Sequence, residues 1–185
     1  MSAGVLNIKL FTVEEYYKMG EIGILNSDDR FELIHGQIIK MSPVKSLHSS
    51  ITDDLFGMLY SILNKKVIVK SQNPIRLSNL SEPQPDLTIA HYKKHKYRQK
   101  HPQSKDIYWL IEVSDSTLQK DKTIKKELYA KAGIPEYWIV NIPEKCIAVY
   151  RNLEEEQYQE VIIFNKGEKV TFEKLGFTLS VDDIF

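Results

Sequence analysis

The amino-acid sequence predicts a single α/β domain in which helices pack against a mixed β-sheet. Short apolar runs rich in β-formers alternate with two stretches whose apolar residues recur at helical spacing. One helical stretch lies between the runs Ile107–Val113 and Tyr137–Val140, the order of a βαβ unit with parallel strands and a right-handed crossover. At 185 residues and 42% hydrophobic, the chain has the size of one core spanning residues 1–185.

Composition narrows the function classes. With 25 basic and 25 acidic residues the net charge is zero, so overall charge does not indicate a polyanionic partner. The single cysteine, Cys146, excludes an intrachain disulfide and fits a reducing compartment. The start, MSAGVLNIKLF, has no basic segment followed by a long apolar one, and no apolar run reaches membrane-spanning length. We therefore expect a cytoplasmic protein with no membrane partner.

The N-terminal third predicts a helix, a hairpin and a longer helix. Thr12 can cap a short helix that ends near Met19-Gly20, and Glu15 can complete a capping box. RFELIHGQIIKM gives two β-rich runs around His35-Gly36, where the glycine supplies the positive φ of a tight hairpin. From about Ser46 to Asn64 the apolar spacing predicts a long amphipathic helix.

The remaining two thirds predict mostly strands. A second helix is expected from about Lys120 to Ala132, with Ile124, Leu128 and Ala132 as its core stripe and Gly133 as its terminator. The tail from Phe177 to Phe185 could add an edge strand or a docking segment. The expected strands are Lys66–Ser71, Ile75–Leu77, Leu87–Ala90, Ile107–Val113, Tyr137–Val140, Cys146–Arg151 and Tyr158–Phe164.

Two carboxylates mark the ends of the most apolar runs. Asp86 opens Leu87–Ala90, and Glu112 nearly closes Ile107–Val113. If these strands are antiparallel neighbours, the start of one lies beside the end of the other, so the two carboxylates meet at one edge of the sheet. Facing carboxylates repel, and a divalent metal ion is the usual remedy. We place the function at this pair.

Four phrases in the chain resemble a known family. FELIHGQIIKMSP, PQPDLTIA, LIEVSDST and KKELYAKAGIPEYWIV, in this order, look like the bacterial restriction-endonuclease-like domains of the PD-(D/E)XK nuclease superfamily. The resemblance runs from about Thr12 to Val140, and the last phrase is the most distinctive. It implies a restriction-endonuclease-like mixed sheet flanked by helices, here with an extra N-terminal hairpin and C-terminal strands.

The same resemblance implies an endonuclease that uses Mg²⁺ or Mn²⁺ to hydrolyse phosphodiester bonds of nucleic acid, with DNA as the expected substrate. Asp86 and Glu112 would hold the metal, which prefers carboxylate and water oxygens. The superfamily's lysine usually follows the glutamate by two residues, where this chain has Ser114. The family moves that lysine to the next helix, where Lys125 is the first candidate and Lys126 the second. An ammonium there offsets charge that develops in the transition state.

Further candidates come from the same phrases. Glu32, in FELIHG, matches an acidic position of the family and is a candidate third ligand or water-holding group. His48, at the start of the long helix, could contact a substrate phosphate or orient Glu32. A homodimer would suit double-strand cutting, although no interface is legible in the sequence.

The same residues also allow interpretations without catalysis. Asp86 could serve a turn after proline, and Glu112 could form a buried salt bridge with Lys125 without catalysis. The chain could also be an inactive nuclease fold kept for nucleic-acid binding or dimerisation, which the serine at position 114 favours. The basic loop 91–105 resembles a nucleic-acid grip, but it joins the far ends of the two strands and is more simply a solvated loop.

Overall fold

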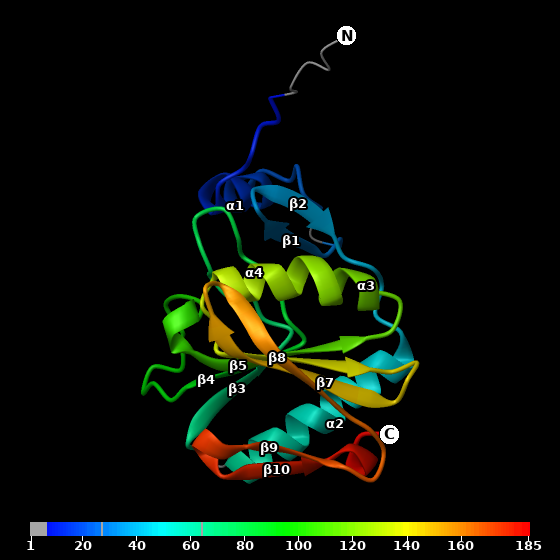
Figure 1. The fold of residues 1–185 in the computed structure, drawn as a ribbon. Coiled ribbons are helices and arrows are strands. Elements are labelled where there is room, and N and C mark those ends of the chain that lie inside the picture. The colour runs from blue at the N-terminus through cyan, green and yellow to red at the C-terminus, as the bar shows by residue number, and fades with distance from the viewer. Residues whose placement is uncertain (1–6, 27, 64) are drawn as a thin grey trace.

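A six-stranded mixed sheet forms the centre of the molecule, in the order β3-β4-β5-β6-β7-β8 (Figure 1). The computed structural model describes residues 7–26, 28–63 and 65–185. Strands β5 and β6 are parallel and all other neighbours are antiparallel, which confirms the α/β class and the βαβ unit. The strands are β3 (Val67–Ser71), β4 (Leu87–His91), β5 (Ile107–Ser114), β6 (Glu136–Asn141), β7 (Cys146–Glu154) and β8 (Gln157–Phe164).

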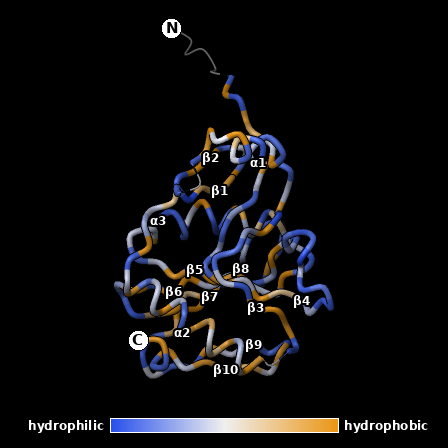
Figure 2. The backbone as a smooth tube through the Cα atoms, turned by 180° about the vertical axis from the view of Figure 1, so that it is seen from behind, coloured by the Kyte–Doolittle hydropathy of each residue, from blue (hydrophilic) through white to orange (hydrophobic). Residues whose placement is uncertain are grey.

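Helices and two small hairpins cover the faces of this sheet (Figure 1). Helix α2 (Ser46–Leu63) and the hairpin of β9 (Lys169–Phe172) and β10 (Phe177–Ser180) lie on one face. The segment of α3 (Leu118–Lys120), a π-turn (Asp121–Lys125) and α4 (Lys126–Lys131) lies on the other. Figure 2 shows hydrophobic stretches along the central strands between these layers. None of the described helices is both long and apolar enough to cross a membrane.

Side chains of β5 alternate between the two faces, and this decides where Glu112 lies. Trp109, Ile111 and Val113 pack on the α2 side, while Leu110 packs with α4. Because successive strand residues point to opposite faces, Glu112 shares the face of Leu110. The sheet therefore presents this carboxylate to the segment from α3 to α4.

The N-terminal unit matches its sequence prediction closely. Helix α1 (Val13–Glu21) begins with the Thr12–Glu15 capping box, in which each side chain accepts a hydrogen bond from the other residue's backbone N–H. Strands β1 (Phe31–Ile34) and β2 (Gln37–Lys40) form the hairpin, with His35 and Gly36 at φ 51° and 73°. A Cβ at Gly36 would lie 2.7 Å from the Leu10 Cβ, so glycine is required there for space as well as for backbone conformation.

Two strand predictions need correction. Ile75–Leu77 is not a strand, because its amide groups donate to the carbonyls of Pro83, Pro102 and Ser81 rather than to one neighbouring strand. The C-terminal tail does form a strand, β10, but β10 pairs with the unanticipated β9 and not with the main sheet. Phe172 of β9 packs against Trp109, with ring centroids 4.2 Å apart, so the hairpin seals the core instead of extending the sheet.

One residue of the predicted core stripe of the second helix is wrong. Ile124 is 44% exposed, whereas Lys125 is only 4% exposed. Leu128 is buried and Ala132 packs against the core, as predicted, and Asp121, Lys125, Tyr129 and Ala130 are buried as well. The turn Asp121–Lys125 is a π-turn, which is wider than an α-turn, so counting at 3.6 residues per turn from Leu128 places the wrong residue inward. Such π-bulges occur frequently at functional sites.

Candidate functional site

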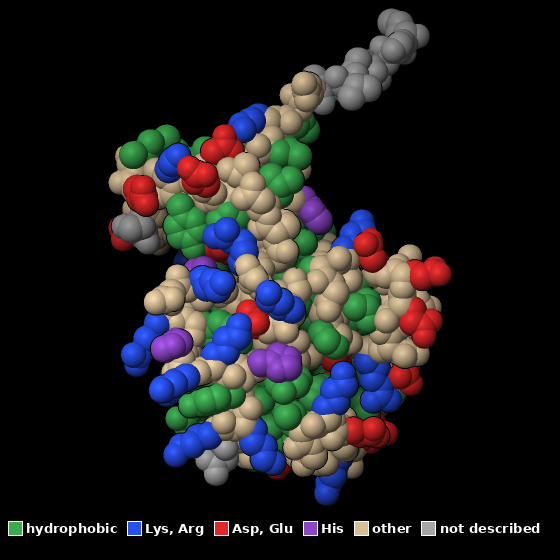
Figure 3. Space-filling model, turned by 90° about the vertical axis from the view of Figure 1, so that its left-hand side faces the viewer, with side chains coloured by type: hydrophobic (Ala, Val, Ile, Leu, Met, Phe, Trp, Pro, Cys, Tyr) green, Lys and Arg blue, Asp and Glu red, His purple; other side chains and the backbone are tan. Residues whose placement is uncertain are grey.

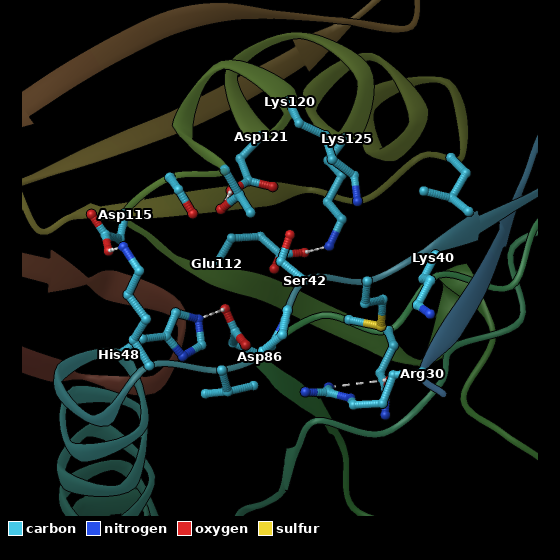
Figure 4. A pocket seen from close by; sticks show the side chains of 18 residues that line it. Arg30, Lys40, Ser42, His48, Asp86, Glu112, Asp115, Lys120, Asp121 and Lys125 are labelled. Carbon is cyan, nitrogen blue, oxygen red and sulfur yellow. Dashed lines mark hydrogen bonds and ion pairs between the residues drawn. The ribbon is translucent and has the colours of Figure 1, made fainter. Parts of the chain in front are cut away.

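Asp86 and Glu112 line one pocket of about 180 Å³ at the end of the sheet (Figure 4). Strands β4 and β5 are antiparallel, with Leu87 opposite Ile111. The next position along each strand is Asp86 on one side and Glu112 on the other, as the sequence predicted. The α2 N-terminus, the end of the β1–β2 hairpin and the start of α3 supply the other walls of this pocket, called here the acid pocket.

Glu112 is buried and is held by two donors. Its Oε1 accepts hydrogen bonds from Lys125 Nζ at 2.8 Å and from the Tyr129 hydroxyl at 2.6 Å. Burial raises the pKa of Glu112 to about 8, and the negative charges of Asp86 and Asp121 act in the same direction against Lys125. Burial thus outweighs the effect of the Lys125 ammonium on the pKa of this carboxyl group.

Lys125 stands between two carboxylates. Its ammonium lies 2.8 Å from Glu112 Oε1 and 3.6 Å from Glu32 Oε2. Burial by itself lowers the pKa of Lys125, but these two carboxylates outweigh it and hold the pKa above that of an exposed lysine. The side chain therefore remains an ammonium at any physiological pH.

Glu32 completes this part of the network. Its Oε1 accepts from Lys120 Nζ at 2.5 Å, and its Oε2 accepts from the backbone N–H of Gln84 at 3.3 Å. Burial alone raises the pKa of Glu32, but Lys125 and Lys120 bring it below the ordinary value. Glu32 thus fixes two lysines rather than projecting an uncompensated charge into the pocket.

Asp86 is oriented by the α2 helix and by strand β5. Its Oδ2 lies 3.1 Å from His48 Nε2 and accepts from the Val113 amide at 2.9 Å. Burial opposes the negative charge, but the His48 and Val113 contacts lower the pKa of Asp86 overall. The hydrogen bond to Asp86 raises the pKa of His48 against the effect of burial. His48 therefore orients Asp86, and not Glu32 as the sequence suggested.

Ser114 occupies the position two residues after Glu112, where the superfamily usually has its lysine. Its side chain holds the next helical segment in place. The Ser114 hydroxyl donates to Asp121 Oδ2 at 2.8 Å, and the Thr117 hydroxyl donates to the same oxygen at 2.7 Å. Ser114 is fully buried. These two bonds fix the start of the helical segment that carries Lys125 over the sheet end.

The structure brings together all but one of the predicted site residues. Lys126 lies outside the acid pocket, with its Nζ 5.7 Å from the centroid of the Tyr150 ring. Lys120 and Tyr129 contact predicted site residues, Asp121 contacts Ser114, and none of the three was among the site residues predicted from the sequence. Asp121, Lys125 and Tyr129 follow one another at four-residue spacing, so three polar groups on one helical face were the available signal.

The oxygen atoms of the acid pocket suit a small divalent cation. Among the described residues no group of three or more His, Cys, Asp and Glu could hold a metal ion. Mg²⁺ needs fewer protein ligands, since it keeps several waters and binds through one or two carboxylates. Both donors to Glu112 use Oε1, and within the described part of the chain Asp86 Oδ1 accepts only one long hydrogen bond, of 3.4 Å from Gln72. One oxygen of each acid therefore remains available, and the residues fit Mg²⁺ or Mn²⁺.

Comparisons with known proteins bear on the whole chain. The sequence profile of Uma2, a family described as "putative restriction endonuclease", matches residues 13–182. The fold is similar to the crystal structure of a putative nuclease belonging to DUF820 from Anabaena variabilis, with a TM-score of 0.73 and 18% sequence identity. That likeness covers 95% of this chain and 97% of the other and establishes a shared fold. A search of curated proteins gave no match.

Proposed function

Because the chain belongs to the Uma2 family, we propose that it is an endonuclease that hydrolyses phosphodiester bonds of DNA with the help of Mg²⁺ or Mn²⁺. One observation carries the proposal. A buried ammonium, Lys125, lies 2.8 Å from Glu112 Oε1 and comes from the helical segment that follows β5. It stands in for the lysine that the motif lacks at Ser114.

Lys125 acts as a cation and not as a base. Its raised pKa keeps it protonated, so it cannot accept a proton from water at neutral pH. An ammonium fixed beside the acid pocket instead stabilises negative charge that develops on the phosphoryl oxygens or on the attacking oxygen. The contacts with Glu32 and Glu112 hold it in place before substrate arrives.

Asp86 and Glu112 would hold the metal ion. When bound, the ion polarises a phosphoryl oxygen and lowers the pKa of a coordinated water. His48 and the Val113 amide orient Asp86, and Tyr129 orients Glu112. These partners hold both carboxylates in one geometry, which is what a small cation with strict ligand geometry demands.

The rim of the acid pocket is suited to a phosphodiester. Arg30 and Lys120 line the pocket from the hairpin side and from α3. Arg30 makes only a long contact of 3.4 Å, to the amide oxygen of Gln84. Its guanidinium is therefore available for a phosphate, and Lys120 can share its charge between Glu32 and substrate.

A second candidate is a nuclease fold without activity, used for nucleic-acid binding or dimerisation. The observation in its favour is that Glu112, Lys125, Tyr129 and Glu32 already satisfy one another as a buried network. Such a network can be purely structural. Metal binding separates the two candidates, because an ion-pair network without available oxygens has no reason to take up Mn²⁺.

Nicking of supercoiled plasmid DNA tests the proposal. Wild-type protein should convert supercoiled to open-circular DNA with Mg²⁺ or Mn²⁺ and stop when EDTA is added. The Glu112→Gln variant, prepared in the same way, serves as the blank for contaminating nucleases. Activity of the wild type no higher than this blank, on plasmid and on single-stranded DNA, would leave the inactive fold as the better account.

A further inference from the structure

Basic residues are concentrated at the end of β4 and β5 that is remote from the acid pocket. Residues 65–76 and 91–105 contain ten of the 25 lysines and arginines of the chain and no aspartate or glutamate. Figure 3 looks onto this part of the surface, where Lys, Arg and His side chains gather at the lower left of the view, while Asp and Glu side chains lie along the right edge and at the upper left. A chain with zero net charge thus carries a local basic surface.

The two basic segments converge in space. Val67 of β3 pairs with His91 of β4, which places the start of β3 beside the loop that follows β4. The pKa of His101, in that loop, is lowered by burial and, against the opposing effect of Glu82, by the positive charges of Lys70 and Arg76. Lys70 and Arg76 of the first segment therefore lie close enough to His101 of the second segment to act on its charge.

Two adjoining hollows, about 480 and 510 Å³ in volume, open on this surface. They share Arg76 and Gln103 in their walls, and no Asp or Glu lines either one. The other lysines and arginines of the walls are Arg98, Lys100 and Lys105. With Arg76, these three are called here the cationic tract.

Arg76 is built into the cationic tract. Its Nε donates to Glu82 Oε2 at 2.5 Å, and the Tyr17 hydroxyl donates to the other oxygen of the same buried carboxylate at 2.6 Å. Arg76 also lines both hollows. Arg98 and Lys100 are exposed, and neither makes a side-chain hydrogen bond or an ion pair within the described chain.

We propose that the cationic tract binds the phosphate backbone of duplex DNA at a second contact, remote from the acid pocket. The proposal rests on the proposed function for the identity of the polyanion. The groups that the tract offers to a ligand are cations, and cations contact phosphate oxygens rather than base faces. The hydroxyls of Tyr17 and Tyr97 are used within the protein, on Glu82 and on the His91 carbonyl, and Lys93 lies over the Tyr97 ring.

The edge strand β3 connects the cationic tract to the acid pocket. Lys70 lies along this edge, and Gln72, two residues further, donates its backbone N–H to the Asp86 carbonyl at 2.8 Å. Strand β4, which runs between the two ends of the sheet, is five residues or about 17 Å long at roughly 3.4 Å per residue.

Fluorescence anisotropy with a labelled 20-base-pair duplex in EDTA tests the proposal without cleavage. The test variant combines Arg98→Gln with Lys100→Gln, and the matched control combines Lys166→Gln with Lys169→Gln, two exposed lysines elsewhere. The test variant should bind about tenfold more weakly at 0.1 M salt, and its log–log salt slope should be shallower by about 1.8, at 0.9 per lost phosphate contact. The control should match wild type.

Equal losses in both double variants, or no loss in either, would overturn the proposal. So would a salt-dependent self-association that the test variant abolishes while DNA affinity is unchanged, because the partner would then be an acidic surface of a second copy. The Glu112→Gln variant separates the two proposals. If wild type fails to nick plasmid but both wild type and Glu112→Gln bind through the tract, the nuclease proposal fails and the DNA contact stands.

Discussion

The two ends of the β4–β5 strand pair differ in how their charges are compensated. At the acid pocket, Glu112 and Lys125 are buried and bonded to one another, and the carboxylates Glu32, Asp86 and Glu112 each have a partner on another element. At the cationic tract, Arg98 and Lys100 are exposed and their charges face solvent. Buried charges need fixed partners, whereas exposed ones are screened by water and salt.

This difference assigns separate tasks to the two ends. Groups held in one geometry before substrate arrives can stabilise a transition state, since their reorganisation has already been offset by folding. Exposed lysines and arginines can attract a polyanion over a distance of about a Debye length, but they do not position reacting atoms. Chemistry is therefore expected at the acid pocket and affinity at the cationic tract.

The largest effect should come from removing one metal-ligand charge. Asp86→Asn and Glu112→Gln should each abolish measurable Mn²⁺ binding in calorimetric titration, because two carboxylates are the whole protein contribution to the site. The Arg98→Gln, Lys100→Gln variant should bind Mn²⁺ like wild type. Retained Mn²⁺ affinity in both acid variants would mean that the pair is a structural ion-pair network.

A smaller effect concerns pH and the stability of the metal-free protein. In the unfolded chain the Glu112 side chain has the ordinary glutamate pKa of 4.5, whereas in the folded protein burial raises this pKa to about 8. Between these values the folded state binds more protons, so the free energy of unfolding falls as pH rises. The fall should be on the order of 3 kcal/mol and should be absent from Glu112→Gln.

Urea unfolding in EDTA at pH 5, 6.5 and 8 measures this, with Glu154→Gln, an exposed change on β7, as the control. Wild type and Glu154→Gln should lose stability in parallel. Saturating Mn²⁺ should restore most of the loss at pH 8, because the cation stabilises the ionised carboxylate. Equal pH slopes in Glu112→Gln and wild type would show that Glu112 titrates as an ordinary acid.

The smallest effect compares tyrosines at the two ends. Tyr129→Phe removes the donor 2.6 Å from Glu112 Oε1 and should cost about 1.5–3 kcal/mol of unfolding free energy, the range for a hydrogen bond to a charged group. Tyr97→Phe removes a half-buried hydroxyl bonded to the His91 carbonyl and should cost about 1 kcal/mol or less. Denaturant midpoints at pH 8 give both values, and a reversed order would contradict the contrast between the ends.

The sequence was sufficient for the sheet end that joins Asp86 and Glu112. Both residues flank strands whose apolar character is unmistakable, and antiparallel pairing then leaves one arrangement. The sequence also predicted the hairpin around Gly36 and the capping box at Thr12, because each depends on residues close together in the sequence.

Other features of the fold depend on contacts between distant segments and could not be predicted from the sequence. The π-turn shifts the inward face from Ile124 to Lys125, and it forms where Asp121 is held by Ser114 and Thr117. The segment Ile75–Leu77 has strand-like residues but finds its hydrogen bonds on three separate loops. The cationic tract required the structure, because only strand pairing brings residues 65–76 beside the loop 91–105.

Lys125 is proposed to supply the ammonium for cleavage. Because the Lys125 side chain is buried, the choice of substitution matters. Lys125→Ala would leave a cavity beside Glu112 and Glu32, so Lys125→Met, which keeps the length of the side chain, is preferable. Lys125→Arg retains the charge, and Lys126→Met is the matched control from the neighbouring position outside the pocket.

The decisive measurement is the single-turnover rate of plasmid nicking at saturating Mn²⁺ for these three variants, with Mn²⁺ affinity and thermal unfolding measured on the same preparations. Lys125→Met should lose roughly two to three orders of magnitude in rate while still binding Mn²⁺. Lys125→Arg should retain part of the activity, and Lys126→Met should match wild type. Equal rates for folded Lys125→Met and Lys126→Met would contradict the account.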